Sequence, residues 1–245
     1  MPNPIKVKAT VDKIISVSHK VYKLLLRTSG RKQRFHPGQF LHLAIDDYDP
    51  MGGFWPDSRV FSIASSPSSQ LIEIIYSVKG SFTARMENEL MVSSQVWLKL
   101  PYGDFIINNF INEGNNQVVI IAGGTGISPF IPFFSNLNDF YSYSKIYLFW
   151  GVKSPEVFSI GDSIFSHDSK SALNLHLFSE TEDTTQNAYS YNIGMLQGDL
   201  IINAITNRED KIYFISGPPE MITYFKEFLI DAGITESKII IDNWE

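Results

Sequence analysis

The chain has 245 residues, a formal net charge of −6, 44% hydrophobic and 19% charged residues, and no cysteine. This composition is typical of a globular protein with a sizeable core. The lack of thiols excludes disulfides, thiolate zinc sites, a cysteine nucleophile and a cysteine-ligated iron–sulfur cluster within this chain. An acidic balance without a basic block argues against nucleic acid or an anionic membrane surface as a partner.

The opening stretch MPNPIKVKAT lacks the apolar core of a signal peptide. No apolar run reaches the roughly 18 residues that span a bilayer. We therefore expect a cytoplasmic protein without a membrane span. No metal site is expected either, because the histidines are scattered without ligand spacing at His19, His36, His42, His167 and His176.

The first half reads as short strands bounded by turn residues, with one helix among them. The predicted strands lie within Lys6–Thr28, Gly38–Ile45, Arg59–Ser66, Gln70–Val78 and Gln95–Leu100, and the predicted helix is Phe82–Leu90. Evenly spaced short strands with turn signals predict a closed or nearly closed antiparallel β-barrel.

The polar stretch Asn108–Gln117 then reads as a linker, and the pattern beyond it changes. Apolar runs of strand length recur at Val118–Ala122, Lys145–Trp150, Leu173–Ser179, Lys211–Ser216 and Lys238–Asp242, with helical segments between several of them, such as Pro219–Gly233. This alternation predicts a doubly wound α/β domain with a parallel sheet. We expect a barrel domain over residues 1–112 and an α/β domain over residues 113–245.

A glycine turn follows the first strand of the predicted parallel sheet. Gly123, Gly124 and Gly126 allow close approach of the backbone, and the helix expected after Ser128 and Pro129 favours negative charge at its start. The turn lies at the carboxyl end of a strand, where open α/β sheets bind ligands. It is neither a Walker loop nor a complete GxGxxG, so an ordinary tight strand-to-helix turn is the alternative interpretation.

Two stretches of the predicted barrel could also hold phosphate. Arg59 lies in RVFSIASSP, and Gly80, Ser81 and Thr83 precede the predicted helix. Thr83 could cap that helix, and the amides before it could hold an anion. Taken singly, each stretch has a plain alternative: a half-buried strand with one exposed arginine, and a simple capped helix.

Taken together and in this order, the motifs resemble the ferredoxin–NADP reductase superfamily, from about Lys6 to the end of the chain. The series is Arg59–Ser62, Lys79–Thr83, Pro101–Phe105, Gly123–Pro129 and Ser216–Met221. The resemblance implies a flavin on the barrel and the diphosphate of NAD(P)H at the glycine turn.

For the flavin, the resemblance implies that Arg59 pairs with phosphate, Phe61 lies against the isoalloxazine ring and Ser62 lies near N5. Phe61 stands where relatives more often have Tyr, so a hydroxyl contact is lost. The remaining implied flavin contacts are Ser77, Val78 and Lys79 at the ring and Gly80, Ser81 and Thr83 at the phosphate.

For the nucleotide, the resemblance implies that Ser216 lies near nicotinamide C4, where many relatives have Cys. Asp242 would assist proton traffic near N5, and Trp244 would shield the flavin face, unless this is an ordinary strand end with a surface Trp. The other implied contacts are Gly123, Gly124, Thr125 and Gly126 at the diphosphate and Gly217, Pro218 and Met221 at the nicotinamide.

Nucleotide choice is expected to depend on the ends of the second and third strands of the α/β domain. NADPH-using relatives often have Arg after the residue that corresponds to Ser179, and here that position is Glu180. A carboxylate accepts hydrogen bonds from a free ribose hydroxyl but repels a 2′-phosphate. Lys153 on the neighbouring strand acts in the opposite direction, and the balance favours NADH over NADPH.

The predicted function is a flavoprotein oxidoreductase that transfers a hydride from NAD(P)H to bound flavin and then passes electrons to a separate acceptor. That acceptor would be a ferredoxin, a flavodoxin, an oxygenase component or a small molecule. FAD is expected over FMN, because several phosphate-binding groups are present and Tyr48, Phe54 and Trp55 offer aromatic surface to an adenine. The alternative is a non-catalytic flavin- and nucleotide-binding subunit with the same fold.

Overall fold

The computed structural model describes residues 4–110, 117–135, 145–165, 173–182 and 189–243. The chain divides into two compact units, Met1–Ile106 with Ser128–Phe133, and Ile107–Ile127 with Phe134–Glu245. Part of the predicted linker, residues 111–116, lies outside the described residues. Within the described ranges, no helix has both the length and the apolar character needed to cross a bilayer.

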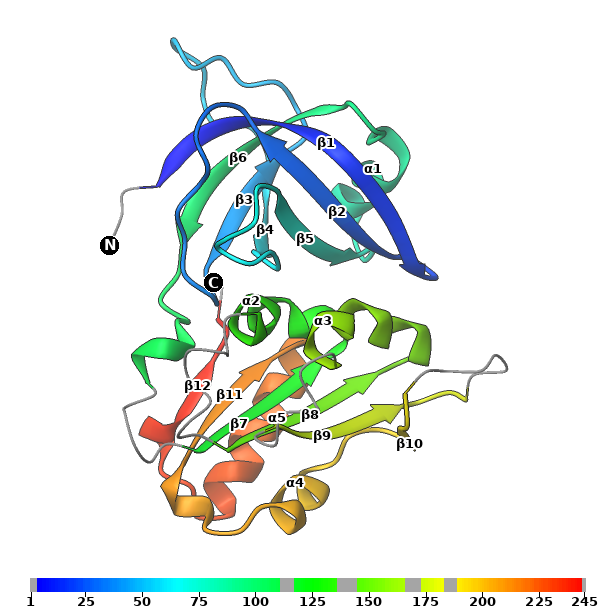
Figure 1. The fold of residues 1–245 in the computed structure, drawn as a ribbon, viewed down its shortest axis with the longest axis vertical. Coiled ribbons are helices and arrows are strands. Elements are labelled where there is room, and N and C mark those ends of the chain that lie inside the picture. Colours follow the sequence, from blue (N-terminus) through cyan, green and yellow to red (C-terminus); the bar gives the residue numbers. More distant parts are fainter. Residues whose placement is uncertain (1–3, 111–116, 136–144, 166–172, 183–188, 244–245) are drawn as a thin grey trace. The chain divides into compact units, whose positions relative to one another are not determined.

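The first unit is built on a six-stranded antiparallel sheet with the order β4-β3-β6-β1-β2-β5 (Figure 1). Its elements are β1 (Ile5–Ser18), β2 (Val21–Thr28), β3 (Phe40–Ala44), β4 (Arg59–Ser62), β5 (Ile72–Ser77), the helix α1 (Ser81–Glu89) and β6 (Gln95–Tyr102). A short 3₁₀ helix, η1 (Ile107–Asn109), follows at the start of the second unit. The six strands and α1 lie where the sequence predicts them.

The antiparallel sheet curls until its edge strands β4 and β5 approach each other. Just beyond β4, the amide of Ala64 donates a 2.8 Å hydrogen bond to the carbonyl of Glu73 in β5. Alternate residues point inward, as Leu24 and Leu26 of β2 illustrate, since both are fully buried. The predicted nearly closed barrel is therefore confirmed.

The second unit is built on a six-stranded parallel sheet with the order β10-β9-β8-β7-β11-β12. Its strands are β7 (Gln117–Gly123), β8 (Ile146–Val152), β9 (Leu173–Ser179), β10 (Asn192–Ile193), β11 (Lys211–Ser216) and β12 (Ile239–Ile241). The helices are α3 (Asp162–Phe165), α4 (Gly198–Ala204) and α5 (Pro219–Asp231). The short helix α2 (Ile131–Phe134) is divided between the units, since its first three residues belong to the first unit and Phe134 belongs to the second. Short 3₁₀ helices are η2 (Gly124–Phe130), η4 (Pro155–Gly161), η6 (Arg208–Asp210) and η7 (Glu236–Lys238).

Both faces of the parallel sheet are covered within the second unit. On one face, Ile201 of α4 and Phe225 of α5 pack against Tyr213 of β11. On β8, Trp150 packs edge-to-face on Phe158 of η4, with ring centroids 5.2 Å apart. Coverage on both faces explains the continuous apolar runs of β7 and β8, and it confirms the predicted doubly wound α/β class.

The sequence missed the edge strand β10 and the helix α4. Both residues of β10 are exposed, so no buried run signals it. The glycine turn also differs in detail from the prediction. The chain enters a 3₁₀ helix at once, over Gly124–Phe130, with Pro129 inside it, and the α-helical turn begins only at Ile131.

Candidate cofactor sites

On the first unit, Arg59 lies beside the start of α1. Its guanidinium carbon lies 5.1 Å from the ring centroid of Phe82, the second residue of that helix. The first turn of a helix carries unpaired amides and a partial positive charge. Two features that the sequence offered separately as phosphate-binding groups therefore lie together on one surface.

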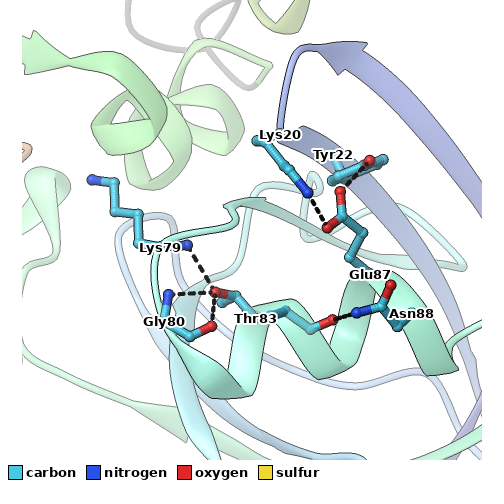
Figure 2. A network of polar contacts seen from close by, with 8 residues as sticks. Lys20, Tyr22, Lys79, Gly80, Thr83, Glu87 and Asn88 are labelled. Carbon is cyan, nitrogen blue, oxygen red and sulfur yellow. Dashed lines mark hydrogen bonds and ion pairs between the residues drawn. The ribbon is translucent and has the colours of Figure 1, made fainter.

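Thr83 organises the turn that leads into α1, as Figure 2 shows. Its Oγ1 accepts hydrogen bonds from the amides of Lys79 at 3.0 Å and Gly80 at 3.2 Å, and it donates to the carbonyl of Gly80 at 3.1 Å. Gly80 is the N-cap of α1 and Thr83 is the third residue of the helix, so the prediction that Thr83 caps the helix is wrong, because its hydroxyl is engaged within the first turn. A Cβ at Gly80 would meet no atom within 4 Å, so this side of the turn is open.

The hydroxyl of Ser62 is the strongest sign that the barrel accommodates a polar ligand. Ser62 is 3% exposed, and its Oγ has no hydrogen-bond partner among the described residues. A buried hydroxyl without a partner costs about 1–3 kcal/mol. A flavin ring, with its several polar edge atoms, would supply a partner, so the residues present fit a flavin. The hydroxyl of Ser65, on the segment after β4, is also buried and has no hydrogen-bond partner among the described residues.

Phe61 packs against a neighbouring strand of the barrel. Its ring is 7% exposed and lies edge-on to Tyr76, with centroids 6.2 Å apart. It packs in the barrel core, so a contact with an isoalloxazine ring stays a prediction. Ser77 and Val78 are half-buried at the end of β5, and Lys79 is exposed.

A polar network that the sequence did not predict anchors α1 to the β1–β2 hairpin. The carboxylate of Glu87 accepts hydrogen bonds from Lys20 Nζ at 2.5 Å and from the Tyr22 hydroxyl at 2.7 Å (Figure 2). The hydrogen bond from Lys20, followed by that from Tyr22, lowers the pKa of Glu87. Because these partners lie about 65 residues away along the chain, no local pattern could have revealed them.

The loop expected to receive an adenine is partly closed. The Tyr48 ring is 8% exposed and lies edge-on to Trp55, with centroids 5.3 Å apart. Lys6 donates a 2.7 Å hydrogen bond to the Tyr48 hydroxyl. Phe54 is 98% exposed. Of the three aromatic residues, Phe54 and the half-buried Trp55 therefore remain open to a ligand.

On the second unit, the glycine turn packs directly against the stretch Ser216–Met221. A Cβ on Gly126 would lie 2.4 Å from the carbonyl oxygen of Ser216, and one on Gly123 would lie 2.2 Å from Met221 Sδ and 3.0 Å from Pro218 Cδ. Gly124 has φ +55° and open space around it. Two of the glycines are thus needed for packing, and Gly124 is needed for the left-handed backbone conformation.

The same edge of the sheet brings together other predicted residues. Ser216 pairs in register with Ala122, next to the glycine turn, and a Cβ on Gly217 would lie 3.1 Å from the amide nitrogen of Gly123. Ser216 Oγ donates a 2.9 Å hydrogen bond to Asp242 Oδ2. Thr125, within the turn, is half-buried. Trp244 lies outside the described residues.

Lys153 and Glu180 follow neighbouring strands at the carboxyl edge of the sheet. Val152 of β8 pairs with Ser179 of β9, and the amide of Glu180 donates a 3.0 Å hydrogen bond to the carbonyl of Val152. Both side chains are exposed, and neither makes an ion pair with a described residue. Ser179 itself is fully buried, and its hydroxyl donates to the carbonyl of Thr181 at 2.7 Å.

The chain thus combines a nearly closed barrel with a parallel sheet that has a glycine turn at its carboxyl edge. Residues 120–227 match the family described as Oxidoreductase NAD-binding domain. Sulfhydrogenase 2 subunit gamma of Pyrococcus furiosus is 28% identical over 215 residues, which cover 84% of this chain and 70% of that protein. The anthranilate 1,2-dioxygenase electron transfer component of Acinetobacter baylyi is 24% identical, covering 96% of this chain and 66% of that protein.

The fold has a counterpart of nearly the same length. A crystal structure of a ferredoxin NADP+ reductase from Neisseria gonorrhoeae, with bound FAD and NADP, superposes with a TM-score of 0.77. The superposition covers 98% of each chain at 18% sequence identity. The chain therefore has the fold of that reductase, and residues 120–227 within it match the NAD-binding family model.

Proposed function

We propose that this protein is a flavin-dependent NAD(P)H reductase that passes electrons to a separate acceptor. The observation that carries the proposal is the position of Arg59 over Phe82 at the start of α1, on the same strand, β4, as Ser62, whose buried hydroxyl has no partner among the described residues. When bound, a flavin accepts a hydride from reduced nicotinamide and releases the electrons to an acceptor.

In this proposal the first unit holds FAD. Arg59 and the first-turn amides of α1 bind the diphosphate, as charge-assisted and helix-terminal contacts respectively. Ser62 donates or accepts at the edge of the isoalloxazine ring, and Thr83 holds the turn in shape. FMN is the alternative cofactor.

The second unit binds the nicotinamide nucleotide. Gly124 keeps the turn open for the diphosphate, because no atom lies within 4 Å of the position that a Cβ would take. Ser216 and Asp242 lie at the same sheet edge, where they would orient the nicotinamide and hold a proton. Glu180 favours NADH, because it repels a 2′-phosphate.

The acceptor is proposed to be a separate protein or small molecule, since the chain has no cysteine to ligate an iron–sulfur cluster. The similarity to an electron transfer component of a dioxygenase supports an oxygenase component as the partner class. A ferredoxin, a flavodoxin and a small-molecule acceptor are the other partner classes that the proposal includes.

The deciding experiment is to record the absorption spectrum of the purified protein, release and identify the flavin, and add NADH anaerobically. We expect FAD to be released and its visible bands to bleach with NADH. A protein that takes up neither flavin on reconstitution contradicts the proposal. A protein that binds flavin but is not reduced by NADH or NADPH is instead the non-catalytic subunit.

The variant Arg59→Ala tests the flavin site itself. Loss of a charge-assisted phosphate contact should weaken FAD binding by about 1.5–3 kcal/mol, or roughly tenfold to 150-fold. Arg27→Ala is the matched control, because Arg27 also makes a 2.6 Å ion pair with an aspartate on the barrel, far from α1 in sequence. An equal loss of FAD affinity in both variants would remove the role of Arg59.

A further inference from the structure

A buried tryptophan holds the glycine turn of the second unit. The indole Nε1–H of Trp150, in β8, donates a 2.9 Å hydrogen bond to the carbonyl oxygen of Gly124. Trp150 pairs in register with Ala122 of β7, so the ring comes from the strand next to the one that leads into the turn. The proposed function gives this turn to the diphosphate of the nucleotide, and Trp150 has no part in that proposal.

The indole ring of Trp150 is fixed in position by its neighbours. Trp150 is fully buried, and the rings of Phe158 and Phe165 pack on it with centroid distances of 5.2 and 6.3 Å. A Cβ on Gly161 would lie only 2.8 Å from Trp150 Cζ3, so glycine is needed there to leave room for the ring. The N–H is therefore a donor that is in place before any ligand arrives, and binding has no ordering cost to meet there.

The hydrogen bond sets the direction of the peptide that follows Gly124. Gly124 has φ +55° and is the first residue of η2, where a helix frays most readily. No atom lies within 4 Å of its Cβ position, so packing alone does not fix this peptide. In a trans peptide the carbonyl and the amide point in opposite directions. Because the carbonyl oxygen faces a buried indole, the amide of Thr125 is directed away from that indole.

The direction of the Gly124 carbonyl matters to an anion beside the turn. A backbone carbonyl oxygen carries partial negative charge, and an amide N–H carries partial positive charge. A diphosphate is repelled by the first and attracted by the second, as in other anion-binding turns. A turn with this peptide rotated therefore binds the diphosphate poorly. The affinity for the nucleotide falls in proportion to the fraction of molecules that have the carbonyl turned inward.

We propose that Trp150 is a positioning residue for the nicotinamide nucleotide, which acts through the Gly124 carbonyl. This inference rests on the proposed function, because it concerns the nucleotide site of that reaction. Loss of the indole N–H should weaken nucleotide binding and leave hydride transfer within the bound complex unchanged. A purely structural role for Trp150 has a different consequence, since any loss of packing around the ring would then have the same effect.

The test is anaerobic stopped-flow reduction of the flavin-loaded protein at a series of NADH concentrations, which yields a dissociation constant and a limiting rate constant. Calorimetric titration with NAD⁺ measures affinity without any reaction. Trp150→Phe keeps an aromatic ring and removes the N–H. Both dissociation constants should rise about threefold to tenfold, the change that corresponds to one net hydrogen bond. The limiting rate constant should stay within about twofold of the wild-type value.

Phe158→Leu is the matched control, because it loosens the packing on Trp150 and retains the indole N–H. Its dissociation constants should stay within about twofold of wild type, less than the change expected for one hydrogen bond. Unchanged dissociation constants in Trp150→Phe, or an equal rise in Phe158→Leu, would overturn the inference and leave the proposed function standing. If neither NADH nor NADPH reduces the wild-type protein, both fail.

Thermal denaturation shows whether each variant is folded. If Trp150→Phe does not fold, Trp150→Met replaces it, because the flexible methionine side chain fills irregular space and has no N–H to donate. That variant is held to the same outcomes.

Discussion

The hydroxyl of Ser216 donates a 2.9 Å hydrogen bond to a carboxylate oxygen of Asp242, and the two residues are only 2% and 6% exposed. Asp242 is also held by its backbone, since its amide donates to the carbonyl of Ile215 at 2.9 Å. The contact joins the end of β11 to the residue after β12. Two positions that the sequence offered as separate candidates are therefore a single buried unit.

This contact predicts that Ser216→Ala destabilises the protein. A hydrogen bond to a charged group contributes about 1.5–3 kcal/mol, and its loss leaves a buried carboxylate with one donor fewer. We expect the free energy of unfolding in urea to fall by about that amount. Ser159→Ala is the control, because its exposed hydroxyl donates only to a backbone carbonyl and its loss should cost less than about 0.5 kcal/mol. Equal effects in the two variants would contradict the prediction.

The glycine turn predicts two different failures from similar substitutions. Gly124→Ala places a methyl group in open space and costs about 1–2 kcal/mol for the left-handed conformation, so the protein should stay folded. The methyl group lies where the diphosphate is proposed, and we expect flavin reduction by NADH to slow by about tenfold to a hundredfold. Stopped-flow spectroscopy at a fixed NADH concentration measures this rate of flavin reduction.

Gly126→Ala should act on the fold instead. Its methyl carbon would lie 2.4 Å from the carbonyl oxygen of Ser216, which is backbone and cannot rotate away. Overpacking of this kind typically costs about 1–3 kcal/mol, occasionally more. If Gly126→Ala keeps the wild-type unfolding midpoint, or if Gly124→Ala keeps the wild-type reduction rate, the separation of roles is wrong.

The Glu87 network predicts a pH-dependent contribution to stability. Lys20 and Tyr22 lower the pKa of Glu87 below its usual 4.5 in the folded protein. The stabilisation is therefore present above pH 4.5 and is lost as the pH falls through the lowered value. Wild type should melt at a higher temperature than Glu87→Gln at pH 7, and the gap should close once the pH lies below the lowered pKa of Glu87. Glu227→Gln, at an exposed position of α5, should show no such gap at either pH.

Local pattern was sufficient to predict most of the fold. Alternation placed the barrel strands, and the apolar runs placed β7, β8 and β11, because those strands are largely buried on both faces, as well as β9, which is half-buried along its middle. The two-residue strand β10 is exposed and leaves no such pattern. Pro129 was interpreted as the start of a helix, but the chain had already turned into a 3₁₀ helix at Gly124, which glycine permits and no periodicity reveals.

The candidate sites were predicted as positions along the chain, not as contacts. The motif series identified Arg59 and the start of α1, but only the fold brings Phe82 beneath the guanidinium. Glu87 could not be found, since its partners are on a distant hairpin. Phe61 was predicted as a ring contact, and whether a ring at 7% exposure meets a flavin depends on packing that a motif does not encode.

Glu180 predicts a preference for NADH. The end of β9 is held beside the end of β8 by the 3.0 Å hydrogen bond from the Glu180 amide to the Val152 carbonyl. Lys153 follows β8 and Glu180 follows β9, so both exposed charges lie at the carboxyl edge of the sheet, where a nucleotide ribose is proposed to bind. A carboxylate there accepts hydrogen bonds from a free 2′-hydroxyl and repels a 2′-phosphate. The wild-type protein should therefore have a higher kcat/KM for NADH than for NADPH.

The variant Glu180→Arg should shift that preference toward NADPH. It removes the repulsion and adds a guanidinium that can bind a phosphate through two hydrogen bonds, so the NADH-to-NADPH ratio of kcat/KM should fall by at least about tenfold. Glu182→Arg is the matched control, since it makes the same charge change two residues along the same exposed segment. A wild-type preference for NADPH would defeat the prediction. A fall of the same size in the control would show that overall charge, and not the position of Glu180 beside Lys153, decides which nucleotide binds.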